Sequence, residues 1–195
     1  MHAFTRMAPA GLIGAVLLFQ GCTSSSELTP DERALLITVA EFEPYMKGGH
    51  DQTRGLFAKE TGLLDHSKLL SYEFTFDKDA HEPALYVNCM VDLQPKGSQA
   101  VSRAAREIGM EIGLASGKLK QVPLEGFPKY GDRSSLSLLT LNGDPVGNLF
   151  TAEYGSKSVM LVFSGIYVRD PAAWGEMFGK KLRLLEAYDV SAAKD

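Results

Sequence analysis

The sequence predicts a single α+β domain, with a mostly antiparallel sheet of about six strands and helices packed on it. Three observations support this class. Alternating polar and apolar residues recur in runs of strand length, neighbouring runs are joined by short turns, and three segments carry apolar residues at helical spacing. Strands that follow one another through short turns pair antiparallel, whereas parallel strands need a long crossover. We expect the order helix, two strands, helix, four strands, helix within residues 30–195.

The first helix is expected at Pro30. Thr29 can cap it, Pro30 suits the first helical position, and Glu32 completes a capping box. Pro44 should interrupt any continuation of this helix, because proline breaks the hydrogen-bond ladder. Residues 47–66 are rich in glycine and polar side chains and predict a long loop.

Two alternating strands are expected next, at residues 70–77 and 85–93. Cys89 falls on the apolar face of the second strand. We expect it in the core, because free cysteines are among the most buried residues. A helix should then run from Ser98 to about Leu114. Its apolar stripe consists of Val101, Ala105, Ile108 and Ile112.

Four strands and a helix complete the predicted domain. Asn142-Gly143 predicts a tight hairpin within this group, and Asp170-Pro171 predicts the start of the last helix. The last strand is apolar at successive positions, so it should be central, with helices covering each side. The strands are expected at residues 119–124, 135–141, 146–153 and 158–165. The core where the last strand meets the last helix should contain Val159, Leu161, Phe163, Trp174, Phe178 and Leu182.

Composition agrees with an ordinary folded domain. Hydrophobic residues make up 45% of the 195 residues and charged residues 23%, which excludes a disordered acidic tail and a multi-span membrane protein. Lys and Arg number 20 against 24 Asp and Glu, for a net charge of -4. This balance disfavours nucleic-acid binding, because such proteins carry a basic surface.

The first residues have the pattern of an export signal. Arg6 is followed by an apolar run over residues 12–19, which is well short of the roughly 20 residues that span a bilayer. Cys22 stands directly after a small residue at the end of this region. We expect residues 1–21 to be a signal peptide and residues 22–29 to be a lipidated cysteine with a flexible, serine-rich tether.

Gly21-Cys22 resembles the end of a bacterial lipoprotein signal, in which Leu, a small residue, and Gly or Ala precede the cysteine. Phe19 and Gln20 depart from that pattern. The resemblance implies that Cys22 carries diacylglycerol and palmitate and becomes the first residue of the mature chain. Thr23, rather than Asp, after the cysteine resembles the pattern sorted to the outer membrane. An unmodified, cleaved secretory signal is the alternative.

A second resemblance covers about residues 30–190. The element order, Gly131-Asp132 before a hairpin pair, and Asp170-Pro171-Ala172-Ala173-Trp174 at the start of the last helix resemble small exported lipoproteins of the Mog1/PsbP-like type. That group is functionally mixed and contains many non-enzymatic binding or assembly factors. The resemblance transfers no site residues.

The sequence predicts no catalytic residue, no metal ligand and no cofactor. Three histidines of the predicted domain adjoin acids, in His50-Asp51, Asp65-His66 and His81-Glu82. These pairs lie in predicted loops, and none has the spacing that places two ligands on one helix face. We therefore interpret them as solvated loop residues. Serine-hydrolase and phosphate-loop motifs are missing from the sequence.

Two surfaces are candidates for binding a partner. Phe127 and Tyr130 lie in a turn-rich loop, where aromatic anchors supply contact area, although they would serve equally to cover the edge of the core. Tyr86 and Met90 lie on the outer face of their strand, where solvent is the alternative partner. The leading hypothesis is a non-enzymatic, lipid-anchored cell-envelope protein that binds another envelope protein for assembly, secretion, motility or surface organisation. A periplasmic carrier or sensor for a small apolar ligand and a loop-histidine hydrolase are the alternatives.

Overall fold

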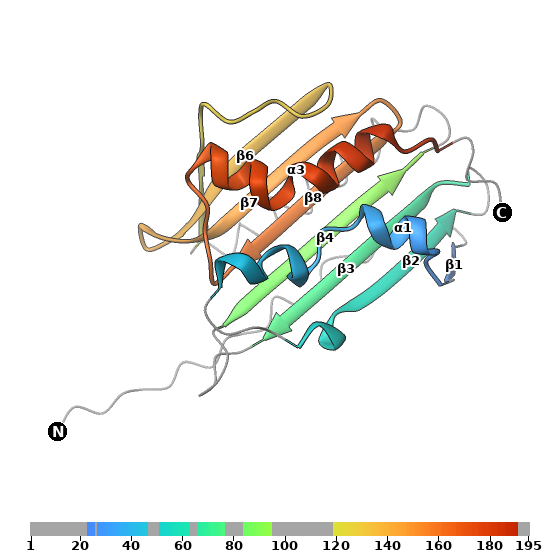
Figure 1. The fold of residues 1–195 in the computed structure, drawn as a ribbon, viewed down its shortest axis with the longest axis horizontal. Coiled ribbons are helices and arrows are strands. Elements are labelled where there is room, and N and C mark those ends of the chain that lie inside the picture. Colours follow the sequence, from blue (N-terminus) through green and yellow to red (C-terminus); the bar gives the residue numbers. More distant parts are fainter. Residues whose placement is uncertain are drawn as a thin grey trace.

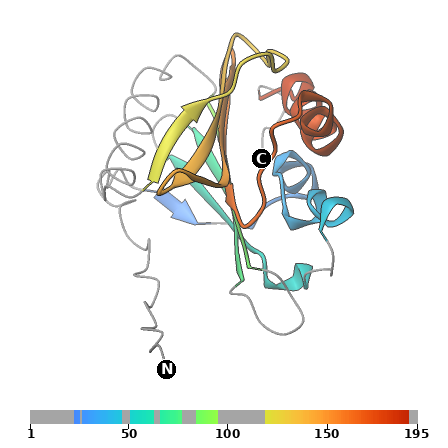
Figure 2. The same cartoon turned by 90° about the vertical axis from the view of Figure 1, so that its left-hand side faces the viewer.

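The protein is described by a computed structural model that covers residues 23–25, 27–46, 51–62, 66–76, 84–94 and 119–190. The strands of these ranges form one eight-stranded sheet in the order β1-β2-β3-β4-β8-β7-β6-β5, and every neighbouring pair is antiparallel. Figure 1 shows helices α1 and α3 in front of the sheet, and Figure 2 shows both on the same side of it. We call that side the helix face and the opposite side the second face. The predicted α+β class with an antiparallel sheet is confirmed.

Helix α1 (Pro30–Leu35) begins where the sequence predicts. The Thr29 hydroxyl accepts a hydrogen bond from the Glu32 N–H at 3.2 Å, and the Glu32 carboxylate accepts one from the Thr29 N–H at 2.9 Å. The chain then forms two separate 3-10 turns, η1 (Val39–Glu41) and η2 (Glu43–Tyr45). The predicted interruption at Pro44 is wrong, because the helix already ends at Leu35, where the backbone of Leu36 becomes extended, and Pro44 lies within the second turn. A third turn, η3 (Gln52–Arg54), follows later.

Strand β2 (Leu56–Gly62) occupies part of the segment that we expected to be a loop, so that prediction is wrong there. The loop prediction failed because of Lys59, which pairs with Leu70 and lies buried on the helix face. Because lysine is polar, its presence at a core position breaks the alternation of polar and apolar residues from which strands are predicted. Strand β1 (Thr23–Ser25) pairs with the end of β2, so three residues of the expected tether belong to the sheet. The sheet thus has eight described strands instead of about six.

Strands β3 (Lys68–Phe76) and β4 (Leu85–Leu93) form the pair predicted from their alternation. Cys89 on β4 is fully buried among apolar side chains, which confirms its predicted place in the core. Its sulfur accepts a hydrogen bond from the Ile37 N–H at 3.4 Å. This contact joins the segment after α1 to the centre of the sheet.

The remaining strands are β5 (Leu119–Pro123), β6 (Arg133–Leu141), β7 (Asp144–Tyr154) and β8 (Lys157–Ser164). Asn142 and Gly143 have φ angles of 55° and 95°, as the predicted tight hairpin requires. Strand β8 lies between β4 and β7, and its predicted central position is confirmed. The helix expected from Ser98 to Leu114 lies outside the described residues.

Helix α3 (Pro171–Ala187) begins at the predicted cap, where the Asp170 carboxylate accepts a hydrogen bond from the Ala172 N–H at 3.2 Å. At its other end the Lys157 ammonium donates hydrogen bonds to the carbonyls of Glu186 and Tyr188 at 2.5 and 2.7 Å. A cation there satisfies carbonyls that the helix leaves unpaired. Helix α3 is therefore fixed to the sheet at its C-terminal end by a buried strand residue.

The loop that leads from β8 into α3 is held by Asn148, which is fully buried on the helix face of β7. Its side-chain oxygen accepts a hydrogen bond from the Val168 N–H at 2.7 Å, and its side-chain nitrogen donates one to the Val168 carbonyl at 3.0 Å. The oxygen and the nitrogen of the Asn148 side chain thus both form hydrogen bonds with the backbone of Val168. This pairing replaces the water that the loop backbone would otherwise bind.

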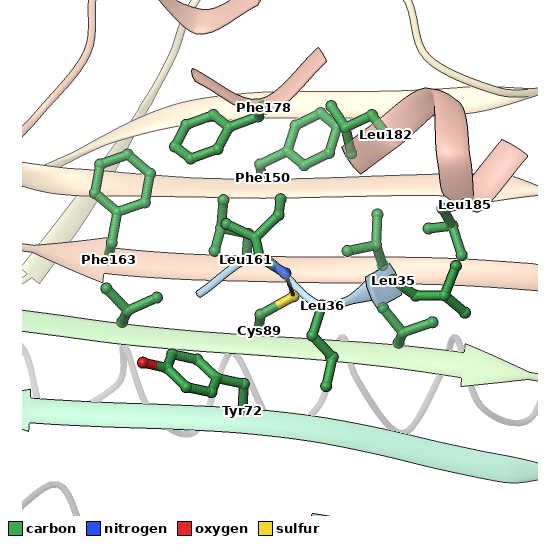
Figure 3. Close-up of a cluster of buried hydrophobic side chains, with 14 of the residues drawn as sticks. Leu35, Leu36, Tyr72, Cys89, Phe150, Leu161, Phe163, Phe178, Leu182 and Leu185 are labelled. Carbon is green, nitrogen blue, oxygen red and sulfur yellow. Dashed lines mark hydrogen bonds between the residues drawn. The ribbon is translucent and has the colours of Figure 1, made fainter. Parts of the chain in front are cut away.

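The core lies between the helix face and the layer formed by α1, the 3-10 turns and α3. Figure 3 shows Leu161 and Phe163 of β8 near Phe178 and Leu182 of α3. The Trp174 and Phe178 rings approach to 4.6 Å between centroids, and the Phe163 and Phe178 rings to 5.8 Å. The predicted core set is confirmed, since all of its members are buried: Val159, Leu161, Phe163, Trp174, Phe178 and Leu182.

Candidate protein-binding surface

The loop from Leu124 to Asp132 is pinned at both ends to the neighbouring strands. The Leu124 N–H donates to the Leu136 carbonyl at 2.9 Å, and the Asp132 N–H donates to the Glu153 carbonyl at 2.7 Å. Between these ends the chain turns at Gly131, which has a φ of +61° and leaves no space for a Cβ beside the Glu153 carbonyl. The loop therefore has a defined shape before any partner binds.

Phe127 and Tyr130 are half-buried in this loop and turn toward the core. The Phe127 ring lies edge-on to Trp174, with the centroids 6.0 Å apart, and the Tyr130 ring lies edge-on to Phe150 at 5.8 Å. Burial raises the pKa of the Tyr130 hydroxyl. The two rings thus hold the loop on the core, while Pro128 and Lys129 between them are exposed.

Strand β5 continues this surface along one edge of the sheet. Its outer side pairs with no described strand, because β5 is the last in the sheet order. Val122 is 47% exposed, and Lys120, Gln121 and Pro123 are exposed as well. An edge strand presents backbone N–H and carbonyl groups that can pair with an extended segment of another chain. We call residues 119–132 the β5 edge surface.

Tyr86 and Met90, the other sequence candidates, lie on the second face at the middle of the sheet. Both are half-buried, and burial raises the pKa of the Tyr86 hydroxyl. Met90 packs against a small apolar cluster on that face, and Asp92 nearby is buried instead of solvated. No described helix lies on the second face. The buried members of this cluster are Leu139, Leu149 and Met160.

Of the three histidines in the predicted loops, only His66 lies within the described part of the chain, so the structure does not test whether they act together. His66 is exposed and has a φ of 54°, whereas His50 and His81 lie outside the described residues. Asp51 accepts a hydrogen bond from the Thr53 N–H at 3.0 Å and so caps a turn. Among described residues, no group of three histidine, cysteine or acidic side chains is arranged to hold a metal ion. Cys89 is buried, and burial raises its thiol pKa to about 12.

One buried charge cluster was missed by the sequence analysis. The Glu32 carboxylate accepts hydrogen bonds from the ammonium groups of Lys59 at 3.0 Å and Lys68 at 3.3 Å, and all three side chains are largely removed from solvent. Burial alone would raise the pKa of Glu32, but the Thr29 N–H and the two lysines outweigh it and hold the pKa below its usual value. The cluster joins α1 to β2 and β3. Only the capping position of Glu32 could be foreseen from sequence spacing.

Comparison of the chain with protein-family models, with curated proteins and with solved structures found no match. Among the residues that the structure describes, no helix combines the length and the apolar character needed to cross a bilayer. Cys22 itself lies outside those residues.

Proposed function

We propose that the protein is a lipid-anchored protein of the bacterial envelope, held by acyl chains on Cys22, that binds another envelope protein through the β5 edge surface. The outer membrane is the proposed location in a cell with two membranes. Two sequence features support the anchor: the short apolar run of the leader and the small residue before Cys22. The mature chain would carry a net charge of -5, because Arg6 is lost with the leader. Attachment therefore depends on the acyl chains.

The observation that carries the binding proposal is the combination of a sheet edge that pairs with no described strand and a loop already held in shape. Ordering a loop on binding costs free energy, and a loop that is fixed beforehand avoids that cost. Phe127 and Tyr130 fix the loop from the core side and leave Lys129 facing outward. A partner can therefore meet a preformed surface.

The sequence of β5 also suits a selective partner. Lys120 and Pro123 are residue types that protect edge strands from uncontrolled pairing, because one adds charge and the other removes a donor. Val122 between them supplies an exposed apolar side chain for a specific contact. We propose that the partner adds an extended segment beside β5 and contacts the loop at Lys129.

The carrier hypothesis gains no support from the described core. The space between the helix face and the helices is occupied by closely packed rings: Phe42, Phe150, Phe163, Trp174 and Phe178. The hydrolase hypothesis requires the histidines to act together. Changing His50, His66 and His81 to Gln in one variant should leave the cellular phenotype intact, and a null phenotype from a folded, membrane-attached variant would favour the hydrolase.

Site-specific photo-crosslinking in cells tests the binding proposal. A photoreactive residue at Val122 or at Lys129 should give the same crosslinked partner, whereas one at Leu184 on α3, which is 43% exposed, should not. In addition, Lys129→Glu should lower recovery of that partner, and Lys180→Glu, the same charge change at an exposed site on α3, should not. Equal crosslinking from all three positions would refute the assignment of the surface.

A further inference from the structure

The second face of the sheet is buried over one half and open over the other. Leu139 on β6, Leu149 on β7 and Met160 on β8 are 5%, 7% and 9% exposed, and we call these three residues the second-face cluster. Leu56 on β2 is in register with Leu149 across β3, β4 and β8, so it points to the same face, yet it is 71% exposed. Neighbours in the plane of a sheet do not cover side chains that stand perpendicular to it. The cluster therefore requires a cover, and no described helix lies on that face.

The chain between β4 and β5 must pass over the sheet. Residues 95–118 form this connection and lie outside the described residues. Strands β4 and β5 run in the same direction, because β8, β7 and β6 lie between them and each neighbouring pair is antiparallel. The chain thus leaves β4 at one end of the sheet and enters β5 at the other, which requires a crossover. The strands that it crosses, β8, β7 and β6, are those that carry the second-face cluster.

The hand of this crossover selects the face. Figure 1 views the sheet from the helix face, and when the view is turned so that β4 points upward, β8, β7 and β6 lie to its left. A connection that leaves the top of β4 and moves left is right-handed only if it passes behind the sheet in this view, over the second face. Crossovers between parallel strands of one sheet are right-handed in about 98% of cases. The helix face, moreover, already carries α1 and α3.

The connection is long enough for this path. Strand β4 has 9 residues. A strand of that length extends about 30 Å, and the four strand spacings from β4 to β5 add about 19 Å sideways, so the diagonal is about 35 Å. A helix over residues 98–114 would be about 25 Å long, and the residues on either side of it would reach about 23 Å more.

We propose that the helix predicted at residues 98–114 lies across the second face, with its apolar stripe packed on the second-face cluster. The stripe consists of Val101, Ala105, Ile108 and Ile112. The sheet is then covered on both sides of β8, as the continuous apolar run of that strand predicts. Met90 is covered as well, which leaves the β5 edge surface as the candidate that a partner can reach. This inference depends neither on lipidation of Cys22 nor on the identity of a partner.

Oxidation of methionines by hydrogen peroxide, followed by peptide mass spectrometry, measures the cover on each face. Met160 is buried on the second face and Met177 on the helix face, so both should react slowly in the native protein. Ile108→Asp should raise the rate at Met160 about tenfold and leave Met177 protected, because a charge in the stripe cannot be buried on an apolar cluster. Arg106→Asp places the same side chain on the opposite side of the predicted helix and should leave both methionines slow.

Photo-crosslinking within the chain locates the segment directly and remains informative if Ile108→Asp unfolds the domain. A photoreactive residue at Ile108 should link to peptides of β7 or β8, and one at Arg106 should link to neither. Links from position 108 to α1 or α3 would overturn the proposal. A folded Ile108→Asp variant in which Met160 stays protected, or a native Met160 that reacts as fast as in denaturant, would also overturn it. Protection of Met160 that is lost on dilution would show that a second copy covers the face instead.

Discussion

Replacing Phe178 with alanine should destabilise the domain by about 4 kcal/mol, because Phe→Ala in protein cores costs about 3–5 kcal/mol through lost transfer energy and a residual cavity. The surroundings of Phe178 in the structure are those for which a cost in this range is expected. The Phe178 ring is fully buried and contacts three others, with centroid distances of 5.4 Å to Phe42, 5.8 Å to Phe163 and 4.6 Å to Trp174. Large rings fixed on the sheet and on helix segments cannot close easily around the space left behind.

Denaturant unfolding followed by tryptophan fluorescence measures this cost directly. Trp174 is the only tryptophan in the chain and adjoins Phe178, so its emission reports on the part of the core that changes. Phe178→Leu keeps most of the volume and should cost about 1–2 kcal/mol. Leu184→Ala on the exposed side of the same helix should change stability by about 0.5 kcal/mol or less. A loss below about 1 kcal/mol for Phe178→Ala would refute the packing of α3 on the sheet.

Three further predictions concern buried polar groups. The pKa of Glu32 in the folded state lies below its usual 4.5, so the stabilising contribution of its carboxylate is present above pH 4.5 and is lost as the pH falls through the folded value. Glu32→Gln should therefore reduce the loss of unfolding free energy at acid pH. An unchanged acid dependence in this variant would contradict the pairing of Glu32 with Lys59. Cys89, with a thiol pKa of about 12, should resist thiol reagents at pH 8 until denaturant is added, and rapid reaction of the native protein would show that it is accessible. Asn148→Ala should cost about 2–4 kcal/mol in denaturant unfolding, because it leaves the buried N–H and carbonyl of Val168 unpaired, and a loss under about 0.5 kcal/mol would mean that water replaces the side chain.

Sequence alone predicted the parts of the fold in which local chemistry and global packing agree. The capping box at Thr29 and Glu32, the positive φ angles at Asn142-Gly143 and the cap at Asp170 are local signals with one structural solution. Apolar alternation located β3 and β4 for the same reason, since each strand buries one face. The central place of β8 followed from its continuous apolar run.

Strands β1 and β2 could not be predicted, because the information lies in contacts distant along the chain. Lys59 is a core residue only because Glu32, 27 positions earlier, supplies a buried carboxylate. Thr23–Ser25 is a strand only because the end of β2 is available to pair with it. Without those partners, a lysine and a run of serines predict a loop and a tether.

The position of the aromatic loop was predicted from the sequence, but the direction of its rings was not. The aromatic loop was identified from its composition, yet sequence could not show that Phe127 and Tyr130 would face Trp174 and Phe150. The place of β5 as the last described strand depends on the strand order, which no local pattern specifies. The side chains proposed to meet a partner are therefore Val122 and Lys129.

Intact mass of the native protein, purified from membranes, tests the account most directly. The proposed anchor and the proposed envelope location both depend on a lipid at Cys22. We predict a chain that begins at Cys22, lacks residues 1–21 and carries the added mass of acyl groups; Cys22→Ser should release a folded domain from the membrane. A native chain that begins elsewhere, or that has an unmodified Cys22, would contradict the account.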